Sequence, residues 1–151
     1  MEIRPDDLTG QAVQDLLAIH LSDMHKNSPA GSVYALDLSG LKALDVTVWA
    51  AWERDVLLGV GALKQLSGTA GEIKSMRTDP KHVRKGVGLS ILNHIIAEAK
   101  RRGYRTLSLE TGSGKEFEPA LHLYRKRGFE NGPAFGDYIA SPFNQFLHMT
   151  L

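Results

Sequence analysis

The sequence predicts an α+β fold in which helices flank a mixed, mostly antiparallel sheet. Residues 46–78 contain three short apolar segments separated by polar turns, which is typical of strands joined as hairpins. Residues 88–103 carry apolar side chains at a helical period, and they lie between two strand-like segments. A strand, a helix and a second strand in this order predict one parallel strand pair inside the sheet.

The bulk composition fits one domain over residues 1–151, with 42% hydrophobic and 23% charged residues. The net charge of +1 gives no field that would attract nucleic acid. The absence of cysteine excludes disulfides, thiolate zinc sites and a cysteine nucleophile, and it suits a reducing compartment. No apolar run approaches the ~20 residues of a membrane helix, and the polar N-terminus is no signal peptide. We therefore expect a cytoplasmic protein without nucleic-acid or membrane partners.

The predicted elements follow one another without linkers or repeats. Residues 1–5 are long enough for an edge strand, and residues 6–25 place apolar side chains at a helical spacing. A short second helix is expected within residues 35–45, with Ser39 as its cap. Three strands joined by polar turns are expected next, at 46–53, 57–66 and 71–78.

Residues 88–103 form the most regular helical pattern of the chain. The predicted apolar stripe of this helix consists of Leu89, Leu92, Ile95, Ile96 and Ala99. Basic residues fill its last turn, where the helix dipole favours cations, and Gly103 ends it. The remaining predicted elements are a buried strand at 106–112, a helix at 116–129 and a last strand at 145–151. One face of the helix predicted at 116–129 holds Phe117, Ala120, Leu121 and Tyr124.

The corner between the strand and the long helix combines basic residues with glycines: Arg84, Lys85, Gly86 and Gly88. A helix N-terminus leaves backbone N–H groups unpaired, and glycine lets a ligand approach them closely. The corner is therefore suited to phosphate or pyrophosphate. On the two glycines alone, a tight turn with solvated cations is the alternative. The spacing fits neither a P-loop nor a dinucleotide-binding fingerprint.

Two motifs near this corner carry a family resemblance. The run 71–104 is similar to the acyl-coenzyme-A binding core of the GNAT N-acyltransferase superfamily, whose corner reads Arg or Gln, two residues, Gly, one residue, Gly or Ala. The segment 123–129, "LYRKRGF", resembles the family's second signature. Together the motifs cover roughly residues 72 to 129. Two positions depart from the pattern, because Val83 stands where the family has Arg or Gln and Phe117 where many relatives have Asn.

More narrowly, "GEIKSMRT" and "SLETGSG" resemble a bacterial subgroup labelled YsnE-type acetyltransferases. The resemblance implies the GNAT fold, in which two central parallel strands splay apart around acetyl-CoA. The backbone of Met76, Arg77 and Thr78 would bind the pantetheine arm and polarise the thioester carbonyl. The pyrophosphate would be held by the N–H groups of Arg84, Lys85, Gly86, Val87, Gly88 and Leu89. Arg84 and Lys85, together with Lys126, would meet the charged phosphates.

Three residues are candidates for the chemistry. Tyr124 matches the family's usual thiolate acid, and a phenol with a pKa of about 10 suits that role; the alternative is a core tyrosine, and both roles are compatible. Glu72 matches the general base of some members, and its alternative is an exposed acid at a strand end. Glu110 would act as a base or as an anchor for the acceptor, and its alternative is a helix-cap or strand-end partner. By strand alternation, Glu72 shares a face with Lys74 and Met76.

The function that follows is N-acetyl transfer from acetyl-CoA to a primary amine of a small molecule or peptide. The transfer would be direct, in a ternary complex, and no metal is expected. Residues 24–37 and the aromatic, Gly- and Pro-rich segment 132–146 are candidates for the acceptor side or for a contact between subunits. The resemblance also allows a homodimer. Two alternatives remain at this stage: an acetyl-CoA-binding regulatory module with little catalysis, and an unrelated nucleotide-phosphate binder.

Overall fold

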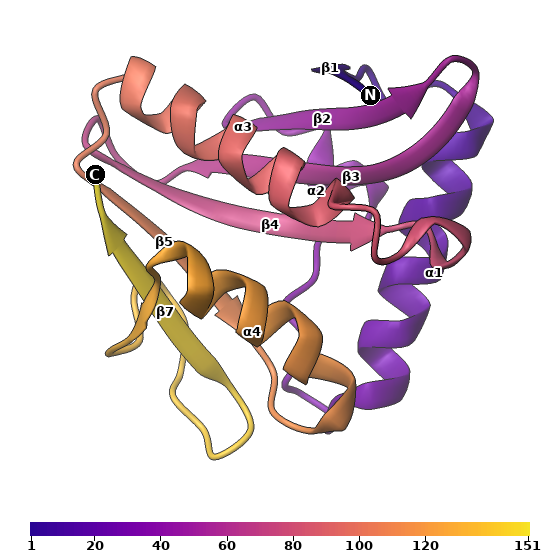
Figure 1. The fold of residues 1–151 in the computed structure, drawn as a ribbon. Coiled ribbons are helices and arrows are strands. Elements are labelled where there is room, and N and C mark those ends of the chain that lie inside the picture. Colours follow the sequence, from indigo (N-terminus) through magenta and orange to yellow (C-terminus); the bar gives the residue numbers. More distant parts are fainter.

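The computed structural model describes all 151 residues, and its seven strands form one sheet in the order β1-β2-β3-β4-β5-β7-β6 (Figure 1). The strands are β1 (Glu2–Pro5), β2 (Val46–Glu53), β3 (Val56–Gln65), β4 (Ala70–Thr78), β5 (Thr106–Thr111), β6 (Glu130–Asn131) and β7 (Gln145–Thr150). The helices are α1 (Gln11–Asn27), α2 (Leu38–Leu41), α3 (Val87–Arg101) and α4 (Glu118–Arg127), with 3-10 turns η1 (Pro80–His82) and η2 (Lys115–Phe117). The predicted mixed sheet is confirmed, because β4 and β5 are parallel and all other pairs are antiparallel.

The parallel pair is short, and this opens the sheet. β4 pairs with β5 only from Ala70 opposite Thr106 to Ile73 opposite Leu109. Beyond Ile73, β4 stays with β3, while β5 stays with β7 (Figure 1). The carboxyl ends of the two strands therefore diverge, as the family resemblance implied. No strand covers the backbone of β4 on the β5 side over its last residues.

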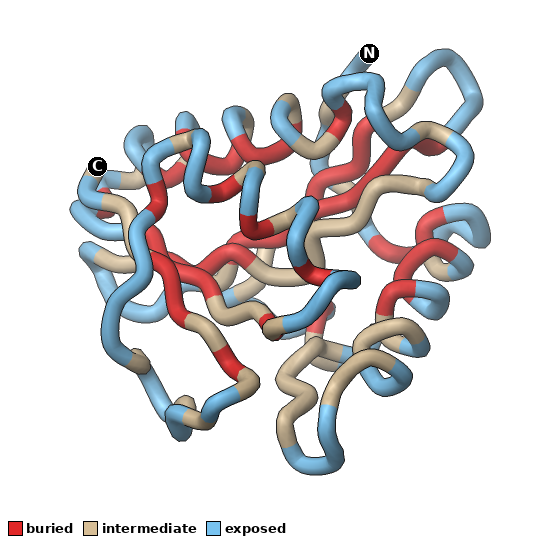
Figure 2. Tube along the Cα trace, turned by 60° about the horizontal axis from the view of Figure 1, so that its bottom comes forward, coloured by how far each residue is buried: buried red, intermediate tan, exposed pale blue.

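The helices bury their apolar faces on both sides of the sheet. α3 and α4 cover one face, where they pack with Ile73, Leu107 and Leu109 in the larger core cluster. α1 and α2 cover the other face over β2 and β3, where Val60 and Ala62 form part of a second cluster. Figure 2 shows the buried positions concentrated along the central strands and the inner sides of the helices. The splay thus lies between two packed layers.

Helix α3 differs from the predicted stripe at its first turn. Its buried residues are Val87, Ile91, Leu92, Ile95, Ile96 and Ala99. The prediction for Leu89 was wrong, since 43% of this residue is exposed. The first turn extends past the core to the opening between β4 and β5. The N-cap of α2 is Asp37 and not the predicted Ser39. The Asp37 carboxylate accepts a hydrogen bond from the N–H of Gly40 at 2.8 Å.

A β-bulge interrupts the alternation of β4. The register with β3 shifts between Val60 and Ala62, and Ser75 takes a left-handed φ of 54°. The extra residue places Met76 against the core under α3, so the prediction that Met76 shares a face with Glu72 was wrong. Gly61 leaves room for this arrangement, since a Cβ there would lie 2.7 Å from the Met76 sulfur.

Candidate active site

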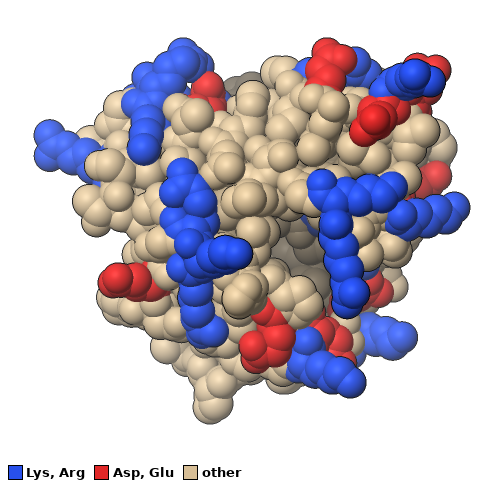
Figure 3. All heavy atoms as spheres, viewed as in Figure 1, with Lys and Arg blue, Asp and Glu red and all other residues tan.

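A cleft of about 660 Å³ follows the splay between β4 and β5. Its walls come from α1 and the loop after it, both splayed strands, the N-terminal turn of α3, and α4. In the space-filling view the surface is hollowed between α3 and α4, and Lys and Arg side chains lie on both sides of the hollow (Figure 3). A space of this size, with a polar rim and apolar walls, is typical of a ligand site.

The corner at the start of α3 presents unused backbone donors to this cleft. No hydrogen bond within the chain uses the N–H groups from Arg84 to Leu89, and no side chain caps the helix. Gly86 adopts φ 79° at the N-cap position, and Arg84 adopts φ 63°, a conformation that L residues rarely take. Such an array of free N–H groups at a positive helix end is an anion site.

The structure divides the predicted phosphate contacts. Arg84, Gly86, Val87, Gly88 and Leu89 line the cleft. Lys85 and Lys126 do not line it: the Lys85 ammonium lies 3.1 Å from Nδ1 of His82, and Lys126 is exposed on α4.

Met76, Arg77 and Thr78 all line the cleft at the end of β4. Because β5 has diverged there, the backbone of this segment has no strand neighbour on the cleft side. The Arg77 guanidinium is paired with Asp23 of α1, which anchors the helix against the strand. After the Ser75 bulge, β4 therefore presents backbone groups as well as side chains to the cleft.

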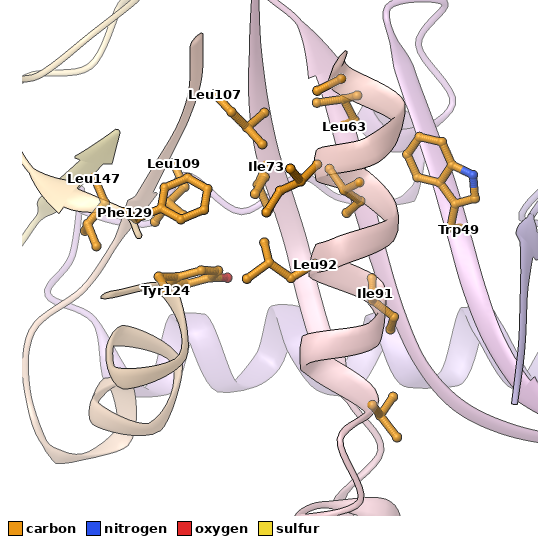
Figure 4. Close-up of a cluster of buried hydrophobic side chains, with 14 of the residues drawn as sticks. Trp49, Leu63, Ile73, Ile91, Leu92, Leu107, Leu109, Tyr124, Phe129 and Leu147 are labelled. Carbon is orange, nitrogen blue, oxygen red and sulfur yellow. The ribbon is translucent and has the colours of Figure 1, made fainter. Parts of the chain in front are cut away.

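Tyr124 belongs both to the core and to the cleft. Its ring packs at 5.9 Å from the Phe129 ring, and the residue is 6% exposed. Figure 4 shows its hydroxyl pointing away from Phe129, toward the side of Leu92. The hydroxyl oxygen has no hydrogen-bond partner in the chain. It is not completely buried, and the residue lines the cleft. Burial raises the pKa of the phenol, so the group remains a proton donor at neutral pH.

Glu72 is not an exposed strand-end acid, since only 3% of the residue is exposed. Its Oε2 accepts a hydrogen bond from the Tyr138 hydroxyl and one from the Lys74 ammonium at 3.3 Å. Lys74 also donates to the Tyr138 oxygen at 2.7 Å and to the backbone carbonyl of Tyr34 at 3.3 Å. Burial and the adjacent Glu72 carboxylate raise the pKa of Tyr138. The result is a closed, charge-balanced cluster on the α1 side of the sheet.

Glu110 lies near the end of β5, directly after the last residue that pairs with β4, and it lines the same cleft. Its Oε2 accepts a hydrogen bond from the Asn144 amide at 2.6 Å. Burial raises the pKa of Glu110; the Asn144 bond and the Lys74 charge oppose this shift, and the Glu72 charge adds to it. Glu110 is therefore a carboxylate of increased basicity within the cleft.

Four residues of this site were not identified individually from the sequence: Lys74 as an ion-pair partner, and Tyr34, Tyr138 and Asn144 as contacts. The last three lie in the two segments, 24–37 and 132–146, that the sequence marked for the acceptor side. The aromatic and Gly/Pro-rich composition of the second segment was the available signal.

His20 of α1 lines the cleft but stays neutral. Burial, together with the nearby Arg77 charge, lowers the pKa of His20 to about 4 from 6.5, although Asp23 partly opposes this. Its Nδ1 is buried without a partner. The unfolded chain binds a proton at His20 below about pH 6.5, and the folded chain does so only near pH 4. Stability linked to His20 is therefore lost as the pH falls through this window.

A His20→Gln variant should lack this contribution to the pH dependence of stability. We expect the wild type to lose about 3 kcal/mol more than the variant between pH 6.5 and pH 4, as measured by urea unfolding at several pH values. The exposed histidine His122 of α4 offers the control, since His122→Gln should follow the wild type. Parallel pH curves for wild type and His20→Gln would show that His20 is not buried neutral.

The cleft, the corner and the second signature occur together in a family of known proteins. Residues 13–129 match the model of the Acetyltransferase (GNAT) family. The chain belongs to this family. The uncharacterized N-acetyltransferase YsnE of Bacillus subtilis (strain 168) is 50% identical to this GNAT protein over 147 residues, which cover 97% of each chain. The protein is thus an acyltransferase, and its uncertain-substrate subgroup is the one that the motifs indicated.

Solved structures agree with the GNAT fold. The structure described as an acyl-CoA N-acyltransferase from Klebsiella pneumoniae superposes with a TM-score of 0.82 at 28% identity, covering 99% of this chain and 97% of that one. A GNAT family acetyltransferase from Elizabethkingia anophelis, solved with acetyl-CoA bound, gives a TM-score of 0.69 at 21% identity, with coverage of 99% and 97%. At 21% identity, the similarity to the Elizabethkingia anophelis structure supports the shared fold alone.

Neither a cluster of metal-ligating side chains nor a membrane-spanning helix is found in this GNAT protein. No group of three or more His, Asp or Glu side chains is placed to hold a metal ion. Its helices are too short or too polar for any of them to span a bilayer.

Proposed function

We propose that this protein transfers the acetyl group of acetyl-CoA directly to a primary amine of a small molecule or peptide, within a ternary complex. One observation carries the proposal. The splay of β4 and β5 joins both sides of the sheet in one cleft, with Tyr124 on the α4 side and the carboxylates of Glu72 and Glu110 on the α1 side. The proton donor for the leaving thiolate, Tyr124, is therefore separated by the thickness of the sheet from the carboxylates that could deprotonate the acceptor ammonium.

The residues of the chain fit acetyl-CoA. The free N–H groups from Arg84 to Leu89 and the Arg84 charge suit the pyrophosphate. The uncovered backbone of β4 from Met76 to Thr78 suits an arm that pairs like an extra strand. When bound, acetyl-CoA supplies an activated thioester, so no covalent enzyme intermediate is needed.

Each proposed catalytic group handles one proton or one charge. A carboxylate, Glu72 or Glu110, removes a proton from the acceptor ammonium. The amine nitrogen then bonds to the acetyl carbon, and the carbon–sulfur bond breaks. Backbone N–H groups of β4 stabilise the negative charge that develops on the carbonyl oxygen. Tyr124 donates its hydroxyl proton to the departing sulfur, and the second proton that the nitrogen loses restores the Tyr124 hydroxyl through solvent. The products are an acetamide and coenzyme A, and one proton remains on the carboxylate base.

Calorimetric titration with acetyl-CoA, with ATP as the control, tests the first half of the proposal. We expect acetyl-CoA to bind in the micromolar range and ATP not to bind. The second half is tested by thiol release with spermidine, tyramine, glycinamide and a peptide with a free N-terminus. Acetyl-CoA binding without turnover of any of these amines would favour a regulatory acetyl-CoA-binding module instead.

A further inference from the structure

We propose that Glu110, and not Glu72, is the base of the acetyl transfer, and that Asn144 is the residue that positions it. The inference rests on the proposed function, whose base it names. It is carried by how differently the chain surrounds the two carboxylates. Glu72 accepts from a buried ammonium and from a hydroxyl, whereas Glu110 accepts from a single neutral amide donor.

The Glu72 carboxylate is already engaged by two donors of the chain. Its side chain and that of Lys74 are 4% and 9% exposed, and their ion pair is closed by the Tyr138 hydroxyl. An ion pair buried to this extent is costly to break, because either charge alone would be left without its partner. The cluster also joins β4 to Tyr34 and Tyr138, from the two segments that flank the acceptor side. Glu72 therefore serves to hold this wall of the cleft together.

Glu110 meets the requirements of a base. It lines the cleft, its Oε1 makes no hydrogen bond within the chain, and only Asn144 donates to its Oε2. The charged or titratable groups that face it are Lys74 and Glu72 on β4 and Tyr138 on the loop before β7. Because Lys74 and Glu72 neutralise each other, Glu110 carries the unpaired negative charge of this end of the cleft. A cationic amine would be drawn to that charge.

Three contacts with Ser141 and Ser32 hold Asn144 in place, so it can keep Glu110 in one orientation. The residue is 7% exposed. Its Oδ1 accepts a hydrogen bond from the Ser141 hydroxyl at 2.5 Å, and its own backbone N–H donates to Ser141 Oγ at 3.1 Å. These contacts fix which side of the amide faces Glu110, and the Nδ2 group also reaches the Ser32 carbonyl at 3.4 Å. The amide donor therefore stabilises the charged form of Glu110 and sets the direction of its free oxygen.

The test is the pH profile of kcat/KM with whichever amine of the panel the wild type turns over fastest, alongside acetyl-CoA titration. Glu110→Gln should lower kcat by about 10²- to 10⁴-fold and remove the enzyme's acid limb, with the Kd for acetyl-CoA unchanged. Asn144→Ala should move the acid limb to higher pH, and Asn144→Asp should move it further because it adds a negative charge. Glu130→Gln, on the exposed strand β6, is the matched control and should resemble the wild type.

Other outcomes separate this inference from the proposed function. An acid limb that persists in Glu110→Gln, or that disappears in Glu72→Gln, would overturn the assignment of the base. Tyr138→Phe keeps every charge and replaces Glu72→Gln if that variant does not fold. A shift of the limb in Tyr138→Phe that exceeds the shift in Asn144→Ala would assign the limb to Glu72, the carboxylate to which Tyr138 donates. If Asn144→Ala lowers kcat/KM equally at every pH without moving the acid limb, Asn144 has a structural role and does not position the base. If the wild type binds acetyl-CoA and acetylates no amine, the proposed function itself fails, and the inference with it.

Discussion

Tyr124→Phe should lower kcat for amine acetylation by about 10²-fold or more, while the Kd for acetyl-CoA stays within about twofold of the wild type. The change removes one oxygen and leaves the ring, which packs against Phe129 in the core. Burial raises the pKa of this phenol, so the wild-type group is protonated throughout the working pH range and can donate to the departing sulfur. Without the donor, the thiolate must leave as an anion in a partly apolar cleft.

The measurement combines steady-state thiol release with calorimetric titration. Tyr104→Phe is the matched control, because Tyr104 is also a buried tyrosine of the larger core cluster but does not line the cleft. Equal rates for the two variants would show that Tyr124 is only a core residue. A weakened Kd with unchanged kcat would instead place the hydroxyl in acetyl-CoA binding.

The sequence predicted those parts of the structure that depend on short-range patterns. The corner around Gly86 was predicted from local composition, since glycines and basic residues at a strand-to-helix junction are visible in the sequence. The order of strands and helices similarly constrains β4 and β5 to be parallel. The face of Met76 was mispredicted because a bulge at Ser75 leaves no clear mark in the sequence. Leu89 was assigned to the core because periodicity identifies apolar residues without telling whether a neighbour covers them.

The acceptor side illustrates why side-chain networks are harder to predict. Tyr138 lies 66 residues from Glu72 in the sequence, and Asn144 lies 34 residues from Glu110. No local period links residues so far apart, since their contact depends on how the loop between β6 and β7 folds across the sheet. The sequence left open whether Glu72 or Glu110 is the base, since both are acids on strands predicted to be adjacent. Only the donors around them distinguish an ion-paired carboxylate from an available one.

Leu89→Glu should weaken acetyl-CoA binding by about 10- to 100-fold and at the same time stabilise the free protein slightly. Leu89 is exposed in the first turn of α3 and lines the cleft beside the free N–H groups of the corner. A carboxylate there interacts favourably with the helix dipole, by about 0.3–1 kcal/mol. The same charge repels a pyrophosphate bound to these N–H groups, by a few kcal/mol at separations of several ångströms and an effective dielectric constant of about 20.

Leu89→Glu is informative because its stability should rise while its affinity for acetyl-CoA falls. A substitution that only damages the fold would lower both the stability and the affinity. Leu89→Gln has nearly the same shape without the charge, so the Glu-to-Gln difference in Kd measures electrostatics alone. That difference should shrink between about 50 and 500 mM salt, since exposed charges are screened over about 4–14 Å in this range. Equal acetyl-CoA affinities for the two variants at low salt would mean that the pyrophosphate does not lie at the start of α3. The corner of Arg84, Gly86 and Gly88 would then be a tight turn with solvated cations, the alternative that two glycines alone could not exclude.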